Sequence, residues 1–275
     1  MAAQALNEVI GMSNSASKPG APAGIVLPPL ESYPVVELEP EVLDRHGIVA
    51  FNSRDPRARP FNLLRTQISK RIAARKARMV GITSATPNAG KSFVSLNLAA
   101  ALSRVAEQPV YLIDLDLRRG SIGNELGLQF EYGLSDFLDG TSPDLAAMGQ
   151  RIGDSSLVVF PTAAISGHSA ELLTGQQFSD LIDAFRAISG PAIILCDLPP
   201  VFANDDTMIA IQKLDGFFTV IDSGHTTRKQ VQDTLQMLQP SPCIGAIMNR
   251  YSGGFMEAYG YGYGYGSKAY DSYYS

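Results

Sequence analysis

The sequence predicts a three-layer α/β fold, with helices on both faces of a doubly wound, mostly parallel sheet. Apolar runs of the length of buried parallel strands recur along the chain. Helical patterns separate most of these runs, and this alternation is typical of a sheet that binds ligands at the carboxyl ends of its strands. After an apolar stretch that begins at Met79, the predicted strands are 110–113, 157–160, 192–196, 217–221 and 244–248, and the predicted helices are 170–188, 205–212 and 226–238.

The first apolar run leads into a phosphate-binding loop. Residues 79–102 pass from that run through a turn-rich loop into an amphipathic helix, with Gly90, Lys91 and Ser92 at the junction. In such loops backbone N–H groups and a lysine converge on the β- and γ-phosphates, and the hydroxyl binds Mg²⁺. Ala85 takes the place of the usual first glycine. The fold is therefore predicted to be a P-loop NTPase, with nucleotide contacts from Ala85, Thr86, Pro87, Asn88, Ala89, Gly90, Lys91, Ser92 and Phe93.

Carboxylates follow two of the other predicted strands. Asp114 and Asp116 come at the end of one strand, and Asp197 ends another. A carboxylate at the end of a buried strand is costly unless it is compensated, and Mg²⁺ beside a triphosphate is a natural compensation. These three aspartates, with Ser92, are the predicted magnesium ligands, and each aspartate is also a candidate catalytic base.

Composition divides the chain into four segments. Residues 1–35 are rich in Ala, Ser, Pro and Gly and are expected to form a disordered arm. Residues 36–78 carry helical patterns at 39–48 and 60–77, and residues 79–250 contain the predicted P-loop domain. Residues 251–275 form a Gly- and Tyr-rich tail that we expect to be flexible, because it has too few aliphatic side chains to build a core.

Charge and cysteine usage limit the class of protein. The chain has 22 Lys and Arg against 27 Asp and Glu, a net charge of −5, which argues against a nucleic-acid partner. Cys196 and Cys243 have neither paired nor metal-ligand spacing, as expected in a reducing compartment. A run of about 18 apolar residues is the usual mark of a membrane helix, and the sequence has none. We therefore expect a cytoplasmic chain that reaches a membrane only through a partner.

Most of the tyrosines lie in the tail, in strict alternation with glycine at first. Mobile phenols of this kind can reach an active site. A sticky segment that self-associates through aromatic contacts is the alternative interpretation. The tyrosines concerned are Tyr259, Tyr261, Tyr263, Tyr265, Tyr270, Tyr273 and Tyr274.

Together, the P-loop, the two acidic strand ends and the tyrosine tail resemble the bacterial tyrosine kinases (BY-kinases) that control polysaccharide export. The resemblance covers about residues 61–275. The Walker A loop of that family matches 85–92, and its Walker B motif matches 193–197. Its Walker A′ motif matches 112–116, with Arg118 and Arg119 behind it.

The resemblance implies an autokinase that uses ATP and Mg²⁺ to phosphorylate its own tail tyrosines, in trans between chains. Lys91 and the loop amides would hold ATP, and Ser92 with one or more of the aspartates would hold Mg²⁺. Asp114 or Asp116 would accept or orient the tyrosine proton, and Asp197 completes the catalytic set. By analogy, Asn249 at the end of the last predicted strand would contact the adenine.

Two other functions share this sequence pattern. ParA/MinD-type ATPases have a signature lysine five residues before the P-loop lysine, and Thr86 occupies that position here, which favours a kinase. An ATP-dependent switch or scaffold would bind nucleotide and leave the tail unmodified. Phosphate on the tail therefore separates the kinase from the scaffold.

The resemblance also implies partners. Many family members assemble rings through an E-x-x-R-x-x-R segment, whose places here hold Arg59, Asn62 and Arg65. Only the last of these residues matches the motif. Self-association is still expected from the family, but the ring geometry stays open because the glutamate of an intersubunit ion pair is missing. A separate membrane adaptor of the chain-length-determinant type would place the chain peripherally at the inner membrane, and a cognate tyrosine phosphatase would be a further partner.

Overall fold

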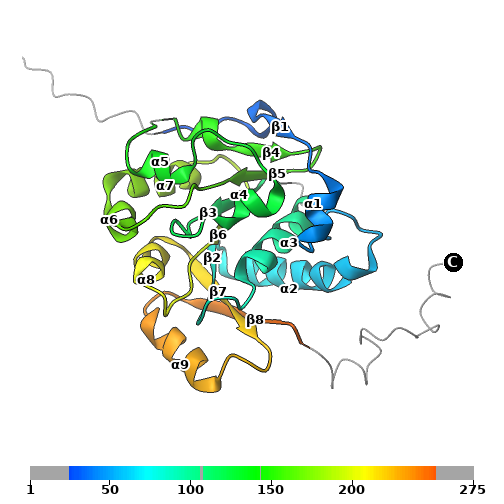
Figure 1. Cartoon of the computed structure of the whole chain (residues 1–275), viewed down its shortest axis with the longest axis vertical. Helices are drawn as coiled ribbons and strands as arrows, with labels where there is room; N and C mark the ends of the chain where they lie inside the picture. Colours follow the sequence, from blue (N-terminus) through cyan, green and yellow to red (C-terminus); the bar gives the residue numbers. More distant parts are fainter. Residues whose placement is uncertain (1–24, 106–107, 143, 252–275) are drawn as a thin grey trace, which may run out of the picture.

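A single mixed sheet forms the centre of the molecule (Figure 1). The computed structural model describes residues 25–105, 108–142 and 144–251. Eight strands of this part of the chain pair in the order β1-β4-β5-β3-β6-β2-β7-β8, in parallel except between β4 and β5. The strands are β1 (Val35–Val36), β2 (Met79–Ser84), β3 (Val110–Asp114), β4 (Gln150–Ile152), β5 (Leu157–Phe160), β6 (Ile193–Asp197), β7 (Gly216–Asp222) and β8 (Cys243–Asn249). The predicted doubly wound, mostly parallel sheet is confirmed.

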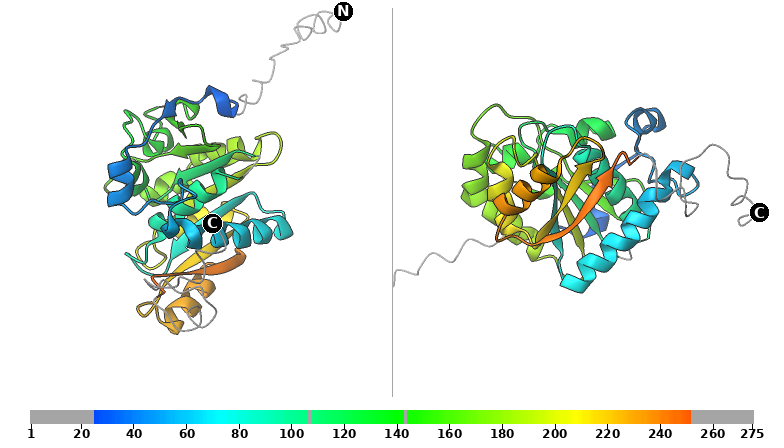
Figure 2. Two further views of the ribbon diagram at one scale, coloured as in Figure 1. Left: turned by 90° about the vertical axis from the view of Figure 1, so that its right-hand side faces the viewer. Right: turned by 90° about the horizontal axis from the view of Figure 1, so that it is seen from below.

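Helices cover both faces of this sheet (Figures 1 and 2). Successive strand residues point to opposite faces, so each face has its own core. Tyr111 and Ile113 of β3 pack on the side of α5, α7 and α8, whereas Val110 and Leu112 pack on the side of α2 and α3. The helices are α1 (Pro40–Arg45), α2 (Arg59–Arg75), α3 (Lys91–Ser103), α4 (Ser121–Leu126), α5 (Leu134–Leu138), α6 (Ser169–Thr174), α7 (Gln176–Arg186), α8 (Asp206–Ala210) and α9 (Arg228–Met237).

The strand order brings the predicted site residues to one edge of the sheet. β6 lies between β3 and β2, and Asp114 at the end of β3 pairs in register with Asp197 at the end of β6. On the other side of β2, Asp222 ends β7 opposite Asn249 of β8. Carboxyl ends of parallel strands share one edge, so the P-loop after β2 lies between these two pairs.

Several helix boundaries differ from the sequence prediction. The helix expected at 170–188 is two helices, α6 and α7, because Gly175 between them has an extended backbone (φ −71°, ψ 167°). The short elements β1, β4, α4 and α5 were not predicted, since each is too short to show a hydrophobic period.

The expected end of the N-terminal arm at residue 35 is wrong. Tyr33 is 2% exposed and its ring packs edge-on against Phe160 of β5. The two residues of β1 add a further strand to the sheet beside β4. The helical segment that follows also belongs to the main core, because Ile68 and Ile72 of α2 pack with residues of α3. Aliphatic and aromatic side chains after residue 24 therefore anchor this region.

The tail tyrosines predicted as acceptors, Tyr259 to Tyr274, lie outside the described residues. Within residues 25–105, 108–142 and 144–251, none of the helices has the length and hydropathy that crossing a membrane requires.

Candidate active site

The loop between β2 and α3 has the backbone shape of a phosphate-binding loop. Asn88 (φ 63°) and Gly90 (φ 86°) adopt the left-handed conformation, and α3 begins at the next residue, Lys91. Asparagine tolerates this conformation and glycine favours it. A Cβ atom at Gly90 would also overlap the side-chain amide of Asn249. Glycine is therefore needed here for both backbone conformation and close approach.

The lysine of the loop lies inside a group of carboxylates. Lys91 is 5% exposed, and its Nζ is 2.7 Å from Asp116 Oδ2 and 3.4 Å from Asp197 Oδ2. Burial lowers the pKa of Lys91, but the charges of Asp197 and Asp116 outweigh it, so the pKa is raised above its usual value. The lysine is thus a cation held where a phosphate group can compete for it.

Hydroxyl groups orient Asp197, which is fully buried. Ser92 Oγ donates a hydrogen bond to Asp197 Oδ2 at 2.8 Å, and Ser95 Oγ donates to Oδ1 at 2.8 Å. Ser121 at the start of α4 donates to Ser92 Oγ at 3.1 Å. Both oxygens of Asp197 therefore have donors, and the Ser92 hydroxyl is hydrogen-bonded to both Asp197 and Ser121.

The two aspartates of the 114–116 segment have different surroundings. Asp114 is fully buried, and its two oxygens accept backbone N–H groups of Asp116 at 3.2 Å and Ile122 at 3.0 Å. Burial and the neighbouring Asp197 raise the pKa of Asp114 well above its usual value. Asp116 instead turns its carboxylate to Lys91. Asp114 thus fixes the chain between β3 and α4, and Asp116 faces the P-loop.

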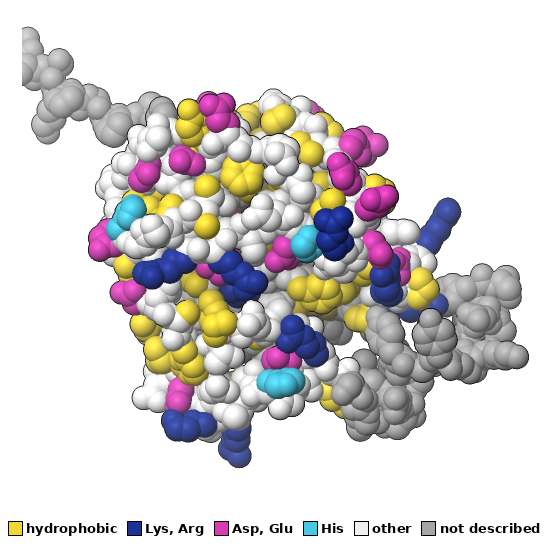
Figure 3. All heavy atoms as spheres, viewed as in Figure 1, with side chains coloured by type: hydrophobic (Ala, Val, Ile, Leu, Met, Phe, Trp, Pro, Cys, Tyr) yellow, Lys and Arg dark blue, Asp and Glu magenta, His cyan; other side chains and the backbone are white. Residues whose placement is uncertain are grey.

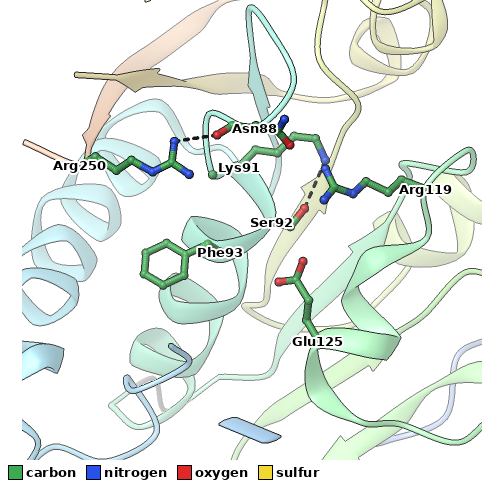
Figure 4. A pocket seen from close by; sticks show the side chains of 8 residues that line it. Asn88, Lys91, Ser92, Phe93, Arg119, Glu125 and Arg250 are labelled. Atoms are coloured by element: carbon green, nitrogen blue, oxygen red, sulfur yellow. Dashed lines mark hydrogen bonds between the residues drawn. The ribbon is translucent and has the colours of Figure 1, made fainter. Parts of the chain in front are cut away.

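A cavity of about 250 Å³ opens beside the P-loop (Figure 4). Besides P-loop residues it is lined by Arg119 and Glu125, from the segment around α4, and by Arg250, which follows β8. Glu125 points toward Ser92 from α4, and burial together with the Asp197 charge raises its pKa. The sequence places Arg119 only behind the 112–116 motif, and no pattern in it indicates Glu125 or Arg250 at the site. Arg250 could have been found as the neighbour of Asn249, whereas Glu125 lies on a helix that showed no signal.

Asn249 lies beside the P-loop, where its side-chain amide bonds the protein itself, and its contact with the adenine stays a prediction. Asn249 Nδ2 donates to the carbonyl of Ala89 at 2.9 Å. Arg250 Nη1 donates to the carbonyl of Asn88 at 2.8 Å (dashed in Figure 4) and to Asp222 Oδ2 at 2.8 Å.

In the space-filling view, basic side chains gather across the middle of one face beside a few acidic ones (Figure 3).

The oxygens of Ser92 and Asp197 fit a magnesium ion whose remaining ligands would be water and phosphate oxygens. Among the described residues, no group of three or more His, Cys, Asp or Glu side chains is arranged to hold a metal by itself. Mg²⁺ commonly takes one or two protein oxygens and completes its shell with water and substrate phosphates. Ser92 Oγ and Asp197 Oδ2 are 2.8 Å apart beside the P-loop, which suits that mode of binding.

These features define a class of protein. A central strand, a loop with left-handed residues, a lysine and a serine at the start of the next helix, and a buried aspartate on the neighbouring strand together make a P-loop nucleotide-binding domain.

Comparison with known proteins places the chain within this class. Tyrosine-protein kinase YwqD of Bacillus subtilis (strain 168) is 30% identical over 209 residues, which is 75% of this chain and 86% of that protein. Tyrosine-protein kinase etk of Escherichia coli (strain K12) is 30% identical over 200 residues, or 72% of this chain but 27% of that protein. The chain thus spans most of the Bacillus relative and about a quarter of the Escherichia one.

Solved structures similar to this chain also include a bacterial tyrosine kinase domain. The kinase domain of the Escherichia coli tyrosine kinase ETK has a TM-score of 0.67 and 27% identity, covering 85% of this chain and 94% of that chain. No protein-family model matches the chain. The chain belongs to the bacterial tyrosine-protein kinase family.

Proposed function

We propose that this chain is an ATP-dependent tyrosine kinase that phosphorylates the tyrosines of its own tail. The observation that supports this most strongly is the convergence of Lys91, Ser92, Asp116 and Asp197 within hydrogen-bonding or ion-pair distance at the P-loop. Phosphoryl transfer depends mainly on positioning and on neutralising charge, and a covalent intermediate is not needed. The side chains around Lys91 can do both.

Each residue has a proposed part in binding the nucleotide and the metal. Lys91 and the amides of 85–92 hold the phosphates of ATP, and Ser92 and Asp197 hold Mg²⁺, which neutralises phosphate charge when bound. Asp114 positions the backbone at Asp116 and Ile122, because each of its oxygens accepts one N–H. It stays a proposed magnesium ligand, since a carboxylate oxygen that accepts one N–H keeps a second lone pair.

Asp116 is the proposed base for the acceptor tyrosine. Among the contacts of the described residues, its carboxylate pairs with the Lys91 side chain and accepts no backbone N–H, whereas each oxygen of Asp114 accepts one. A carboxylate at this place can accept or orient the phenol proton of an entering tyrosine. The seven acceptors are the tail tyrosines from Tyr259 to Tyr274.

We also propose that transfer occurs in trans, as the resemblance to the bacterial tyrosine kinases implies. Self-association would bring the tail of one chain to the site of another.

The cellular setting is proposed from the family. We infer that the kinase regulates polysaccharide polymerisation or export, that it is held at the cytoplasmic side of the inner membrane by a separate adaptor, and that a tyrosine phosphatase reverses the modification. Family membership supports these inferences.

Mass spectrometry of the full chain tests the activity. The wild-type chain with ATP and Mg²⁺, with and without the adaptor's cytoplasmic segment, should carry phosphates on the tail, and Lys91→Met should carry none. To test transfer in trans, a variant with the seven candidate acceptors from Tyr259 to Tyr274 changed to Phe is mixed with Lys91→Met. Phosphate on the Lys91→Met chain supports transfer between chains. ATP binding with an unlabelled tail under every condition would support a nucleotide-operated scaffold instead.

A further inference from the structure

Two consecutive residues outside the P-loop hold two consecutive carbonyls within it. Asn249 Nδ2 donates to the Ala89 carbonyl at 2.9 Å, and Arg250 Nη1 donates to the Asn88 carbonyl at 2.8 Å. Both donors come from the end of β8, which is separated from the P-loop by about 160 residues of sequence. The last strand therefore closes on the phosphate-binding loop from one side.

The geometry of the peptide bond turns these contacts into an orientation of N–H groups. In a trans peptide the C=O and N–H bonds of one plane point in opposite directions. The Asn88 carbonyl points toward Arg250, so the Ala89 N–H of the same peptide plane points away from Arg250. The Ala89 carbonyl points toward Asn249, so the Gly90 N–H points away from Asn249. These are amides of the loop that, in the proposed nucleotide site, face the phosphates.

Arg250 is itself fixed by other groups. The same Nη1 that bonds Asn88 is 2.8 Å from Asp222 Oδ2 at the end of β7, and Asp222 is 8% exposed. His225 Nδ1 lies 3.5 Å from the other carboxylate oxygen. The backbone N–H of Arg250 donates to Asn249 Oδ1 at 3.0 Å, and Arg250 has a left-handed φ of 55°. A non-glycine residue in this conformation is held there by its surroundings, and here the surroundings are the P-loop and β7.

We propose that Asn249 and Arg250 form a clamp that orients the Ala89 and Gly90 amides for the phosphates, so that Arg250 is a positioning residue for the nucleotide. The clamp rests on the nucleotide site of the proposed function and adds a role that a contact between Asn249 and adenine does not include. Asp222 is its anchor, because its carboxylate holds the guanidinium at the Asn88 carbonyl. The clamp also explains why Gly90 has to lack a side chain, since Asn249 occupies that space.

Equilibrium binding of MgADP and of adenosine to the full chain tests the clamp. Arg250→Ala should weaken MgADP binding by about tenfold, since a charge-assisted hydrogen bond that orients the loop is lost. Adenosine has no phosphates, so its affinity should stay unchanged. Arg250→Lys keeps the charge without the fork of donors and should give an intermediate loss. Asn249→Asp, which replaces the donating amide with a second acceptor facing Ala89, should also weaken MgADP binding by about tenfold.

Arg228→Ala, at an exposed arginine that begins α9, is the matched control and should bind MgADP as the wild type does. The melting temperature of each variant is measured alongside, so that a loss of fold is recognised. Wild-type MgADP affinity in a folded Arg250→Ala chain would overturn the clamp, and so would equal losses for MgADP and adenosine, which would indicate contact with the base. The assay measures binding alone. A chain that binds MgADP tightly and leaves its tail unlabelled would therefore contradict the proposed kinase and leave the clamp standing.

Discussion

Lys91 Nζ lies 2.7 Å from Asp116 Oδ2, and both side chains are almost completely buried. The lysine thus compensates carboxylates that are already inside the protein before any phosphate is present. Asp197 Oδ2 is the second carboxylate oxygen within reach, at 3.4 Å. The P-loop lysine therefore has a part in stability as well as in binding.

Lys91→Met should consequently lower the free energy of unfolding, by about 3 kcal/mol, because it leaves buried carboxylates without a cation. Asp116→Asn should cost less, since Asp197 still pairs with the lysine. In a double-mutant cycle measured by denaturant unfolding, the double variant should be more stable than the sum of the two losses predicts. Strict additivity would show that the pair does not interact in solution.

Gly90→Ala should abolish detectable nucleotide binding in a chain that still folds. The new Cβ would meet the Asn249 amide while the backbone is in a left-handed conformation, so the loop or the last strand must move. Gly190→Ala is the matched control, because Gly190 has a similar φ of 79° with open space around it. That variant should lose only about 1 kcal/mol of stability, the usual cost of a left-handed alanine, and bind MgADP normally. Equal binding by both variants would show that crowding at Asn249 is unimportant.

The sequence predicted the sheet and its P-loop well because both leave strong local signals. Long apolar runs mark β2, β3, β6, β7 and β8, and the Gly90-Lys91-Ser92 junction marks the loop. The different surroundings of Asp114 and Asp116 could not be predicted, since they depend on which backbone N–H groups reach Asp114 and on Lys91 reaching Asp116. Likewise, no spacing in the sequence indicates that Arg250 bonds a carbonyl 162 residues earlier in the chain. Such contacts follow from strand order, which a local pattern does not encode.

Ser95 should matter for stability although it lies one helical turn beyond the P-loop motif. Its hydroxyl donates to Asp197 Oδ1 at 2.8 Å, and both residues are fully buried. Ser95→Ala would leave that oxygen without its donor and should lower the free energy of unfolding by about 1–3 kcal/mol. Ser103→Ala is the control, because the Ser103 hydroxyl bonds only a carbonyl of its own helix in the described contacts. Chemical denaturation of both variants makes the comparison, and equal small losses would mean that water replaces the Ser95 hydroxyl.

Glu125 should make the free energy of unfolding fall as pH rises between the unfolded and folded pKa values of its carboxyl group. Burial and the charge of Asp197 raise the pKa of this carboxyl in the folded chain above the value of about 4.3 expected when unfolded. Between the two pKa values the folded state binds more protons than the unfolded state, so the free energy of unfolding falls as pH rises. The cost of ionising Glu125 is absent below the unfolded pKa and complete above the folded one.

Glu125→Gln removes this ionisation and keeps the shape of the side chain. The variant should therefore gain stability relative to the wild type as pH is raised from about 4 through the folded pKa, and the gain should level off above it. Denaturant unfolding across that pH range measures the difference, and Glu171→Gln, at an exposed glutamate of α6, controls for the loss of one negative charge. The opposite trend, in which Glu125→Gln becomes less stable relative to the wild type as pH rises, would contradict this prediction. It would mean that the Ser121 hydrogen bond and the charges of His46 and Arg119, which lower the pKa, outweigh burial.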